Sequence, residues 1–104
     1  MRTQDIVLTR FRNALEALYG DRIERVVLFG SQARGDARLD SDYDVAVFLK
    51  ELGDRWSEAD RIADAATEVM DETGSFVHAM PYPAGAWRDR TPLMHEIRRE
   101  GRDL

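Results

Sequence analysis

The stretch that decides the fold is VVLFGSQARGDARLDSDYDVAVFL, residues 26–49. A hydrophobic run ends in a Gly-Ser turn at Gly30 and Ser31, and after ten further residues Asp42 and Asp44 open a second hydrophobic run. Glycine at the end of a strand lets the backbone come close to a ligand, and a turn that leads into a helix presents backbone amides to anions. The Ser31 hydroxyl can add a hydrogen bond to a phosphate oxygen, so the turn predicts a phosphate site.

The two aspartates predict a metal beside that turn. Asp42 and Asp44 are two residues apart at the start of a strand, so their side chains are expected on the same face. Neighbouring carboxylates repel each other unless a cation lies between them, and Mg²⁺ binds one or two carboxylates together with substrate phosphates. The aspartates and the Gly-Ser turn each have an ordinary alternative interpretation. The two acids can be solvated at a strand edge, and Ser31 can be a helix N-cap. Their combination favours a metal-dependent phosphate site.

The composition indicates one small globular domain over residues 1–104. The chain has enough hydrophobic residues for a core, at 43 % of 104, and its lack of cysteine excludes disulfides and thiolate metal sites. A net charge of −5 argues against general binding to nucleic acid. No apolar run approaches the roughly 20 residues of a membrane span, and the charged first residues do not resemble a signal peptide. We therefore expect a cytoplasmic protein without membrane or direct nucleic-acid binding.

Hydrophobic periodicity and the positions of glycine and proline predict alternating helices and strands. The predicted helices are residues 5–19, a short one from Ser31 that Gly35 ends, a long one from 54–57 to 73, and a last one from the Thr91 N-cap to Gly101. The predicted strands are residues 23–29, 43–49 and 75–80, and Pro81 and Pro83 break the regular structure after the third strand. This order indicates an α/β fold with a small mixed sheet flanked by helices, which we expect on one side of it.

These residues carry a family resemblance. Gly30-Ser31-Gln32-Ala33-Arg34-Gly35, followed by Ser41-Asp42-Tyr43-Asp44, resembles the signature of the polymerase-β-like nucleotidyltransferase superfamily. More narrowly, it is similar to the minimal nucleotidyltransferases, the MNT group, whose pattern is Gly-Ser-x-Ala-Arg-Gly with a later Ser-Asp-x-Asp. The order of predicted elements agrees with that group over nearly the whole chain. The resemblance therefore implies a nucleotidyltransferase core.

The resemblance implies roles for these positions. Gly30 and Ser31 would hold the β- and γ-phosphates of ATP, and Asp42 and Asp44 would be the catalytic residues that coordinate Mg²⁺. Arg34 would hold phosphate or stabilise the short helix, and Gly35 would permit a tight exit from it. In such enzymes a hydroxyl attacks the α-phosphate, pyrophosphate leaves, and a nucleoside monophosphate stays on the acceptor.

The sequence departs from the family pattern at one place. Active members usually carry a third carboxylate on the next strand, but residues 75–80, SFVHAM, contain neither Asp nor Glu. By strand alternation Phe76, His78 and Met80 share a face, which makes His78 the polar residue nearest to the expected position. Two interpretations stay open: His78 substitutes for the third acid as a metal ligand or base, or it is a partly buried, hydrogen-bonded histidine.

The resemblance also implies a partner. Standalone MNT proteins are commonly the antitoxins of HEPN-domain ribonuclease toxins from an adjacent gene, and they transfer AMP to a toxin side chain such as tyrosine. Larger nucleotidyltransferases bind their acceptor with an additional lobe. We expect that surface to come here from another chain or from a second copy, in a hetero- or homo-oligomer.

Several alternatives remain. The absent third acid motivates a non-catalytic antitoxin, a nucleotide-binding module that neutralises its partner by complex formation. Transfer to a small molecule such as an aminoglycoside is disfavoured because those enzymes need an additional acceptor lobe, and the acidic net charge disfavours nucleic-acid polymerisation. Trp56 and Trp87 can anchor an interface or cap the core, and the core is the favoured interpretation.

Overall fold

The computed structural model describes residues 3–38 and 41–104. Its helices are α1 (Thr3–Tyr19), η1 (Gly20–Arg22), α2 (Ser31–Arg34), α3 (Arg55–Thr73), η2 (Ala84–Arg88) and α4 (Pro92–Glu100), where η marks a 3₁₀ helix. Its strands are β1 (Ile23–Phe29), β2 (Tyr43–Leu49), β3 (Val77–Pro83) and β4 (Arg102–Asp103). The first two strands and the four predicted helices therefore occur close to the bounds that the sequence predicts.

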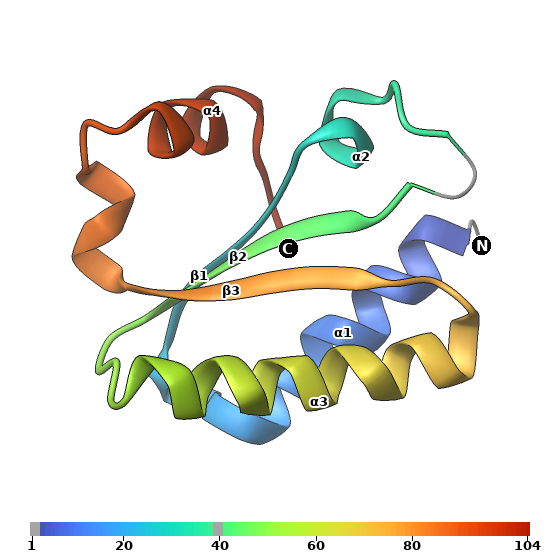
Figure 1. Cartoon of the computed structure of the whole chain (residues 1–104), viewed down its shortest axis with the longest axis horizontal. Helices are drawn as coiled ribbons and strands as arrows, with labels where there is room; N and C mark the ends of the chain where they lie inside the picture. Colours follow the sequence, from blue (N-terminus) through green and yellow to red (C-terminus); the bar gives the residue numbers. More distant parts are fainter. Residues whose placement is uncertain (1–2, 39–40) are drawn as a thin grey trace.

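One mixed sheet organises the described residues. Its strand order is β3-β2-β1-β4. β1 runs antiparallel to both β2 and β4, whereas β2 and β3 are parallel and are joined through α3 (Figure 1). A parallel pair needs such a crossover, because a tight hairpin can join only antiparallel strands. The expected α/β fold with a mixed sheet flanked by helices is confirmed.

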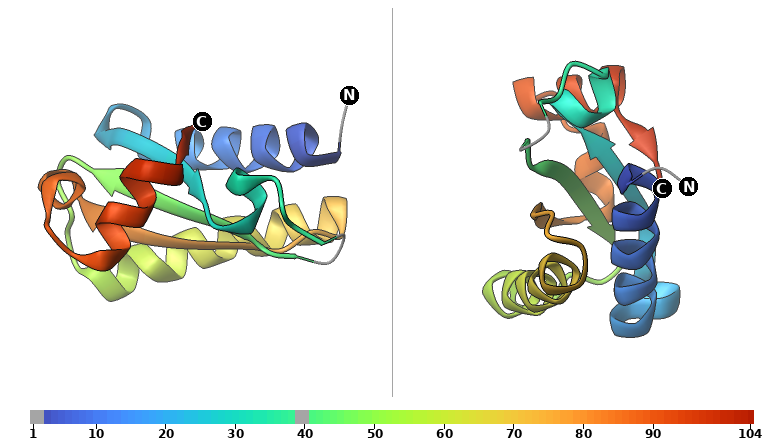
Figure 2. Two further views of the ribbon diagram at one scale, coloured as in Figure 1. Left: turned by 90° about the horizontal axis from the view of Figure 1, so that it is seen from above. Right: turned by 90° about the vertical axis from the view of Figure 1, so that its right-hand side faces the viewer.

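Helices cover both faces of the sheet, so the expectation of helices on one side is wrong. α1 and α3 lie on one face, while α2, η2 and α4 lie on the other (Figures 1 and 2). The second face has its own buried cluster, with Val27, Ala46 and Phe48 of the sheet packed against Met94 and Ile97 of α4. Both faces of β1 and β2 are thus apolar and buried, which explains their continuous hydrophobic runs.

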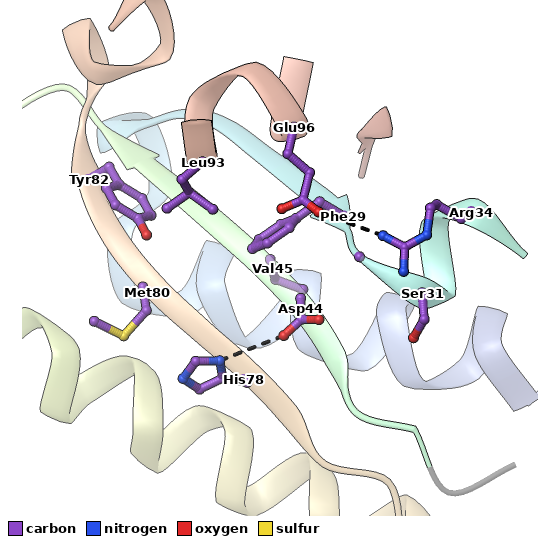
Figure 3. A pocket seen from close by; sticks show the side chains of 11 residues that line it. Phe29, Ser31, Arg34, Asp44, Val45, His78, Met80, Tyr82, Leu93 and Glu96 are labelled. Atoms are coloured by element: carbon purple, nitrogen blue, oxygen red, sulfur yellow. Dashed lines mark ion pairs between the residues drawn. The ribbon is translucent and has the colours of Figure 1, made fainter. Parts of the chain in front are cut away.

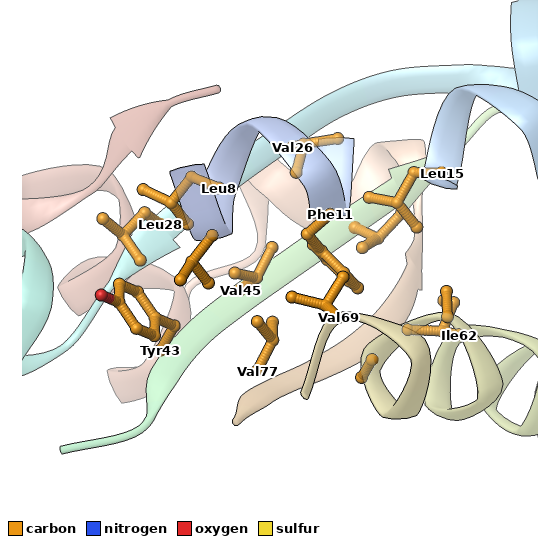
Figure 4. Packing of buried hydrophobic residues seen from close by; sticks show 14 of the residues in the cluster. Leu8, Phe11, Leu15, Val26, Leu28, Tyr43, Val45, Ile62, Val69 and Val77 are labelled. Carbon is orange, nitrogen blue, oxygen red and sulfur yellow. The ribbon is translucent and has the colours of Figure 1, made fainter. Parts of the chain in front are cut away.

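The larger core lies between the sheet and the two long helices. Phe11 and Leu15 of α1 and Ile62 of α3 are fully buried against the sheet (Figure 4). Leu18 of α1 and Met70 of α3 are 41 % and 46 % exposed, although each lies at helical spacing from buried residues of its own helix. Both lie at the margin of a helical stripe, where spacing alone does not say how far the neighbouring element extends.

The two tryptophans differ in position. Trp87 is half-buried and packs on the second cluster, with its ring 5.6 Å from that of Phe48 in an edge-to-face arrangement. Trp56 is 75 % exposed in the first turn of α3, so the core interpretation is wrong for it. None of the helices within residues 3–38 and 41–104 is long and apolar enough to cross a membrane.

The third strand extends further than predicted. β3 spans Val77–Pro83, whereas the sequence predicts a strand over 75–80 that ends before Pro81. β3 is an edge strand, and alternate N–H groups of an edge strand point away from the sheet, so proline there removes no ladder hydrogen bond. The two-residue strand β4 has no periodicity to detect, and it forms because the chain turns at Gly101 and returns along β1.

An ion pair with a buried carboxylate joins α3 to η1, just before β1. Glu58 is only 4 % exposed, and its Oε2 lies 2.5 Å from Nη2 of Arg22. Arg61 lies farther, with 3.7 Å between its Nη1 and Oε1 of Glu58. The Tyr19 hydroxyl donates to the backbone carbonyl of Glu58 at 3.3 Å, and burial, followed by the nearby Glu58 charge, raises the pKa of Tyr19.

We expect Arg22→Met to lower the free energy of unfolding by about 1–3 kcal/mol, because it leaves the buried Glu58 carboxylate with a distant partner. Arg10→Met, which breaks the half-exposed pair with Glu72, is the control and should cost less than about 1 kcal/mol. The Arg22→Met/Glu58→Met double variant should recover part of the loss. Urea unfolding measures all three, and equal losses in the two single variants would contradict the account.

Candidate active site

A cavity of about 460 Å³ opens on the face of the sheet that carries α2 and α4 (Figure 3). It lies over the ends of β1 and β2, with β3 along one side. Its lining residues are Phe29, Gly30, Ser31, Arg34, Asp44, Val45, His78, Met80, Tyr82, Leu93 and Glu96. The cavity has a polar end, formed by Gly30, Ser31, Arg34, Asp44 and His78, and an apolar end, formed by Phe29, Met80, Tyr82 and Leu93.

Strand register brings the polar end together. Phe29, the last residue of β1, pairs with Asp44 of β2, and Asp44 pairs with His78 of β3. Paired residues on neighbouring strands point to the same face of a sheet. Gly30, which follows β1 directly, therefore lies beside Asp44, although fourteen positions separate them in the sequence.

The Gly30 backbone lies directly against the Asp44 carboxylate. Gly30 has φ 74° and ψ −158°, a region that side chains other than hydrogen rarely allow. A Cβ built on Gly30 would lie 2.5 Å from Oδ2 of Asp44. A side chain at position 30 would be strained by this backbone conformation and would displace the Asp44 carboxylate, so glycine lets the turn and the carboxylate lie side by side.

Gln32 fixes the turn to the segment before β2. Its amide nitrogen donates to the backbone carbonyl of Ser41 at 3.0 Å, and the amide of Gln4 in α1 donates to the Gln32 backbone carbonyl at 3.3 Å. Gly35 ends α2 in the left-handed conformation, with φ 83°, and its N–H donates to the Ser31 carbonyl at 3.0 Å. The tight exit that the sequence predicts at Gly35 is therefore present.

Arg34 is held by three carboxylates. Its Nε lies 3.2 Å from Oδ2 of Asp36, and its Nη1 lies 3.6 Å from Oε1 of Glu96 and 3.1 Å from Oε2 of Glu100. The hydrogen bond with Glu100, followed by that with Asp36, raises the pKa of Arg34, and the bond from Arg34 lowers the pKa of Glu100. The pairs with Glu96 and Glu100 fasten α4 to α2 at the edge of the cavity, and Figure 3 shows the pair with Glu96.

Asp44 and His78 face each other across the floor of the polar end. The distance between Oδ1 of Asp44 and Nδ1 of His78 is 3.7 Å, and the side chains are 35 % and 60 % exposed (Figure 3). Asp42 is exposed immediately before β2 and does not line the cavity. Within residues 3–38 and 41–104, no three His, Cys, Asp or Glu side chains gather as a ready-made metal site.

The structure thus brings five of the predicted site residues into one cavity and leaves two outside its lining. Gly30, Ser31, Arg34, Asp44 and His78 line it, and Asp42 and Gly35 do not. Sequence reasoning missed Glu96, Gln32, Tyr82 and Leu93. The spacing of Glu96 and Glu100, one helical turn apart, indicates a shared helix face, but the sequence does not say which side chain that face meets.

The apolar end offers a flat, mostly hydrophobic surface beside the polar groups. Tyr82 of β3 packs against Phe48, with ring centroids 5.7 Å apart. Burial raises the pKa of the Tyr82 hydroxyl, and the nearby Arg55 opposes this effect. A ligand in this cavity therefore meets charged and hydrogen-bonding groups at one end and hydrocarbon at the other. This combination suits a nucleotide, or an aromatic side chain that lies next to a phosphate group.

Residues 13–103 match the family described as polymerase beta, nucleotidyltransferase. The chain belongs to this nucleotidyltransferase family. The match agrees with the geometry, because the Gly-Ser turn and the following aspartate, the two halves of the signature, meet at one cavity. The resemblance stated from residues 30–44 is confirmed, and with it the expectation of a nucleotidyltransferase.

Two similar proteins give a more specific likeness than the family as a whole. The nucleotidyltransferase chain is 32 % identical over 77 residues to a protein of Methanocaldococcus jannaschii that is named provisionally as a protein adenylyltransferase. The aligned region covers 74 % of this chain and 71 % of the relative. A structure named provisionally as a minimal nucleotidyltransferase is 28 % identical with a TM-score of 0.63, covering all of this chain and 97 % of that one.

A third likeness concerns the fold alone. A chain in the structure described as tri-AMPylated Shewanella oneidensis HEPN toxin in complex with MNT antitoxin is 17 % identical with a TM-score of 0.53. It covers 97 % of this chain and 67 % of that one.

We expect Gly30→Ala to lower the free energy of unfolding by about 2–4 kcal/mol, because the backbone strain adds to a collision with the Asp44 carboxylate. Gly35→Ala gives the cost at a glycine in the ordinary left-handed region, with ψ 13°, where a Cβ would meet nothing within 4 Å. It should cost about 1 kcal/mol. Urea unfolding measures the loss from Gly30→Ala in the wild type and in an Asp44→Ala background, and an equal loss in both would show that the contact with Asp44 adds nothing.

We expect Arg34→Met to return the pKa of Glu100 towards its ordinary value, because the Arg34 hydrogen bond is the main cause of its lowering. A pKa that is lower in the folded state stabilises the fold above the unfolded-state value, near 4.5, and this contribution disappears as the pH falls through the folded-state pKa. Carboxyl NMR against pH measures it. Arg99→Met, which removes a weaker partner of Glu100, should have the smaller effect, and the reverse order would contradict the account.

Proposed function

We propose that this chain is a Mg²⁺-dependent nucleotidyltransferase that transfers AMP from ATP to a HEPN-type toxin protein encoded by an adjacent gene, and that it acts as the antitoxin of that pair. The contact between Gly30 and Asp44 carries the proposal, because it puts a Gly-Ser turn and a carboxylate side by side in one cavity. The family match supports nucleotidyl transfer as the reaction class.

The similar proteins support the acceptor and the nucleotide. The relative from M. jannaschii is named provisionally as a protein adenylyltransferase, which supports a protein acceptor. The Shewanella oneidensis complex holds an AMPylated HEPN toxin with an MNT antitoxin, which supports AMP and a HEPN partner. The cavity is open to solvent beside an exposed His78, so a side chain from a partner protein can reach it.

The proposed roles follow the geometry of the polar end. Gly30 and Ser31 hold the β- and γ-phosphates, and Arg34, although already paired with Glu96 and Glu100, can donate to a phosphate at the same end. Asp44, with its carboxylate in the cavity, would hold Mg²⁺ together with Asp42, which is exposed just before the strand and does not line the cavity. The half-exposed Asp44 carboxylate beside a glycine fits such an ion, since no Cβ fills the space next to it. When bound, Mg²⁺ neutralises the triphosphate and favours the ionised form of the attacking hydroxyl.

The reaction balances as a single displacement. The oxygen of an acceptor hydroxyl forms a bond to the α-phosphorus of ATP, and the bond from that phosphorus to the bridging oxygen of the β-phosphate breaks. Pyrophosphate leaves with the electron pair, the hydroxyl proton passes to solvent, and AMP stays on the acceptor. The protein's task is to hold the two reactants in line and to stabilise charge on the phosphates.

The second candidate function is neutralisation of the partner by complex formation without catalysis. One observation favours it: β3 places His78, not a carboxylate, opposite Asp44. An antitoxin that had lost transfer would keep the fold and the cavity, and it would act by covering its partner.

The test is the intact mass of the partner after incubation with this chain, ATP and Mg²⁺. We expect the mass to rise by whole AMP units, and Asp44→Asn to lower the initial rate at least about a hundredfold, because the carboxylate that holds the metal is lost. Asp60→Asn, an exposed aspartate on α3 on the opposite face of the sheet, is the matched control and should leave the rate unchanged.

The outcomes separate the two functions. If the partner stays unmodified and is inhibited equally by the wild type and by Asp44→Asn, neutralisation by binding would replace AMP transfer as the function. A partner that gains AMP equally fast with Asp44→Asn would overturn the assignment of the site.

A further inference from the structure

His78 occupies the position in β3 that faces Asp44 on the neighbouring strand. The two residues are register partners in the parallel pair, and their side chains lie over the same cavity (Figure 3). Among the described residues, the pair with Asp44 is the one ion pair or hydrogen bond of the His78 ring. The ring is 60 % exposed and is not held in the core, so the interpretation of His78 as a partly buried structural histidine is not favoured.

The separation of the two side chains suits a shared ion. Oδ1 of Asp44 and Nδ1 of His78 are 3.7 Å apart. Two ligands of one divalent ion are about 3.0–3.4 Å apart when each lies about 2.1 Å from it. A side-chain shift of a few tenths of an ångström therefore brings both atoms into coordination distance, and the open cavity leaves room for water and phosphate oxygens at the other positions.

We propose that Asp44 and His78 together bind a divalent first-row transition-metal ion in preference to Mg²⁺. The inference rests on the proposed function, because it assigns a metal to the same polar end of the cavity. It goes further in naming His78 as a ligand that sets the identity of the metal.

The preference follows from the chemistry of the ligand pair. Mg²⁺ is a hard ion that selects oxygen ligands and retains water, whereas imidazole nitrogen suits the first-row transition ions. One carboxylate and one imidazole therefore discriminate against Mg²⁺ more strongly than two carboxylates would. A carboxylate at position 78 would weaken this preference.

The test measures metal binding by the tag-free full chain, without ATP or partner. Co²⁺ serves as the probe, because its visible absorption reports nitrogen and oxygen ligands, and Mg²⁺ serves as the competitor. We expect the wild type to bind Co²⁺ with nitrogen coordination. His78→Asp should lower the ratio of Co²⁺ to Mg²⁺ affinity by about tenfold or more, since it exchanges an imidazole for a carboxylate.

Two variants make the result specific. His95→Ala removes the other histidine of the chain, which is exposed on α4, and should leave the affinity ratio unchanged. Asp44→Asn should weaken the binding of both Co²⁺ and Mg²⁺. Circular dichroism confirms that each variant is folded, and the exposure of His78 makes unfolding by its substitution unexpected.

An affinity ratio that His78→Asp leaves unchanged would overturn the inference, as would loss of the Co²⁺ spectrum in His95→Ala. Either result would leave AMP transfer with Mg²⁺ standing, because the mass measurement of the partner does not depend on it. Absence of AMP transfer, conversely, would not alter the affinity ratio of the two metals.

Discussion

The close approach of the Gly30 backbone to the Asp44 carboxylate is the constraint on which the site depends. A side chain at position 30 would occupy the space of Oδ2 of Asp44, so the turn can lie on the end of β2 only with glycine there. Once this contact is made, strand register brings His78 to the other side of Asp44. A turn suited to phosphate, a carboxylate and an imidazole thus come together through one local packing requirement.

The helix α4, which packs on the second face of the sheet, completes the cavity beside this contact. α4 packs Met94 and Ile97 on the sheet, which buries a small second core. Its acidic residues reach Arg34 at the end of α2, so the helix that covers the sheet also orients an arginine that lines the cavity. Glu96 and Glu100 already neutralise Arg34 in the structure. A bound phosphate would therefore share this arginine with α4.

Much of this could be predicted from the sequence, because it depends on local patterns. The first two strands, the four helices, and the meeting of Gly30 with Asp44 follow from hydrophobic runs, glycine positions and a known signature. What could not be predicted depends on tertiary partners. The continuous hydrophobic runs of β1 and β2 are typical of strands buried on both faces, but a short amphipathic helix such as α4 does not reveal which face it covers. The prolines of β3 suggest that the strand is interrupted. Only the sheet order shows that this strand lies at the edge, where proline is tolerated. The partners of Arg34 in α4 lie about sixty residues away along the chain.

The most direct test of the central claim is a crystal structure of the chain with a non-hydrolysable ATP analogue and a divalent metal. The account predicts that the β- and γ-phosphates lie on the Gly30–Ser31 turn and that a metal ion contacts both the Asp44 carboxylate and a phosphate oxygen. A nucleotide bound away from that turn, or a metal ion with no contact to Asp44, would contradict it.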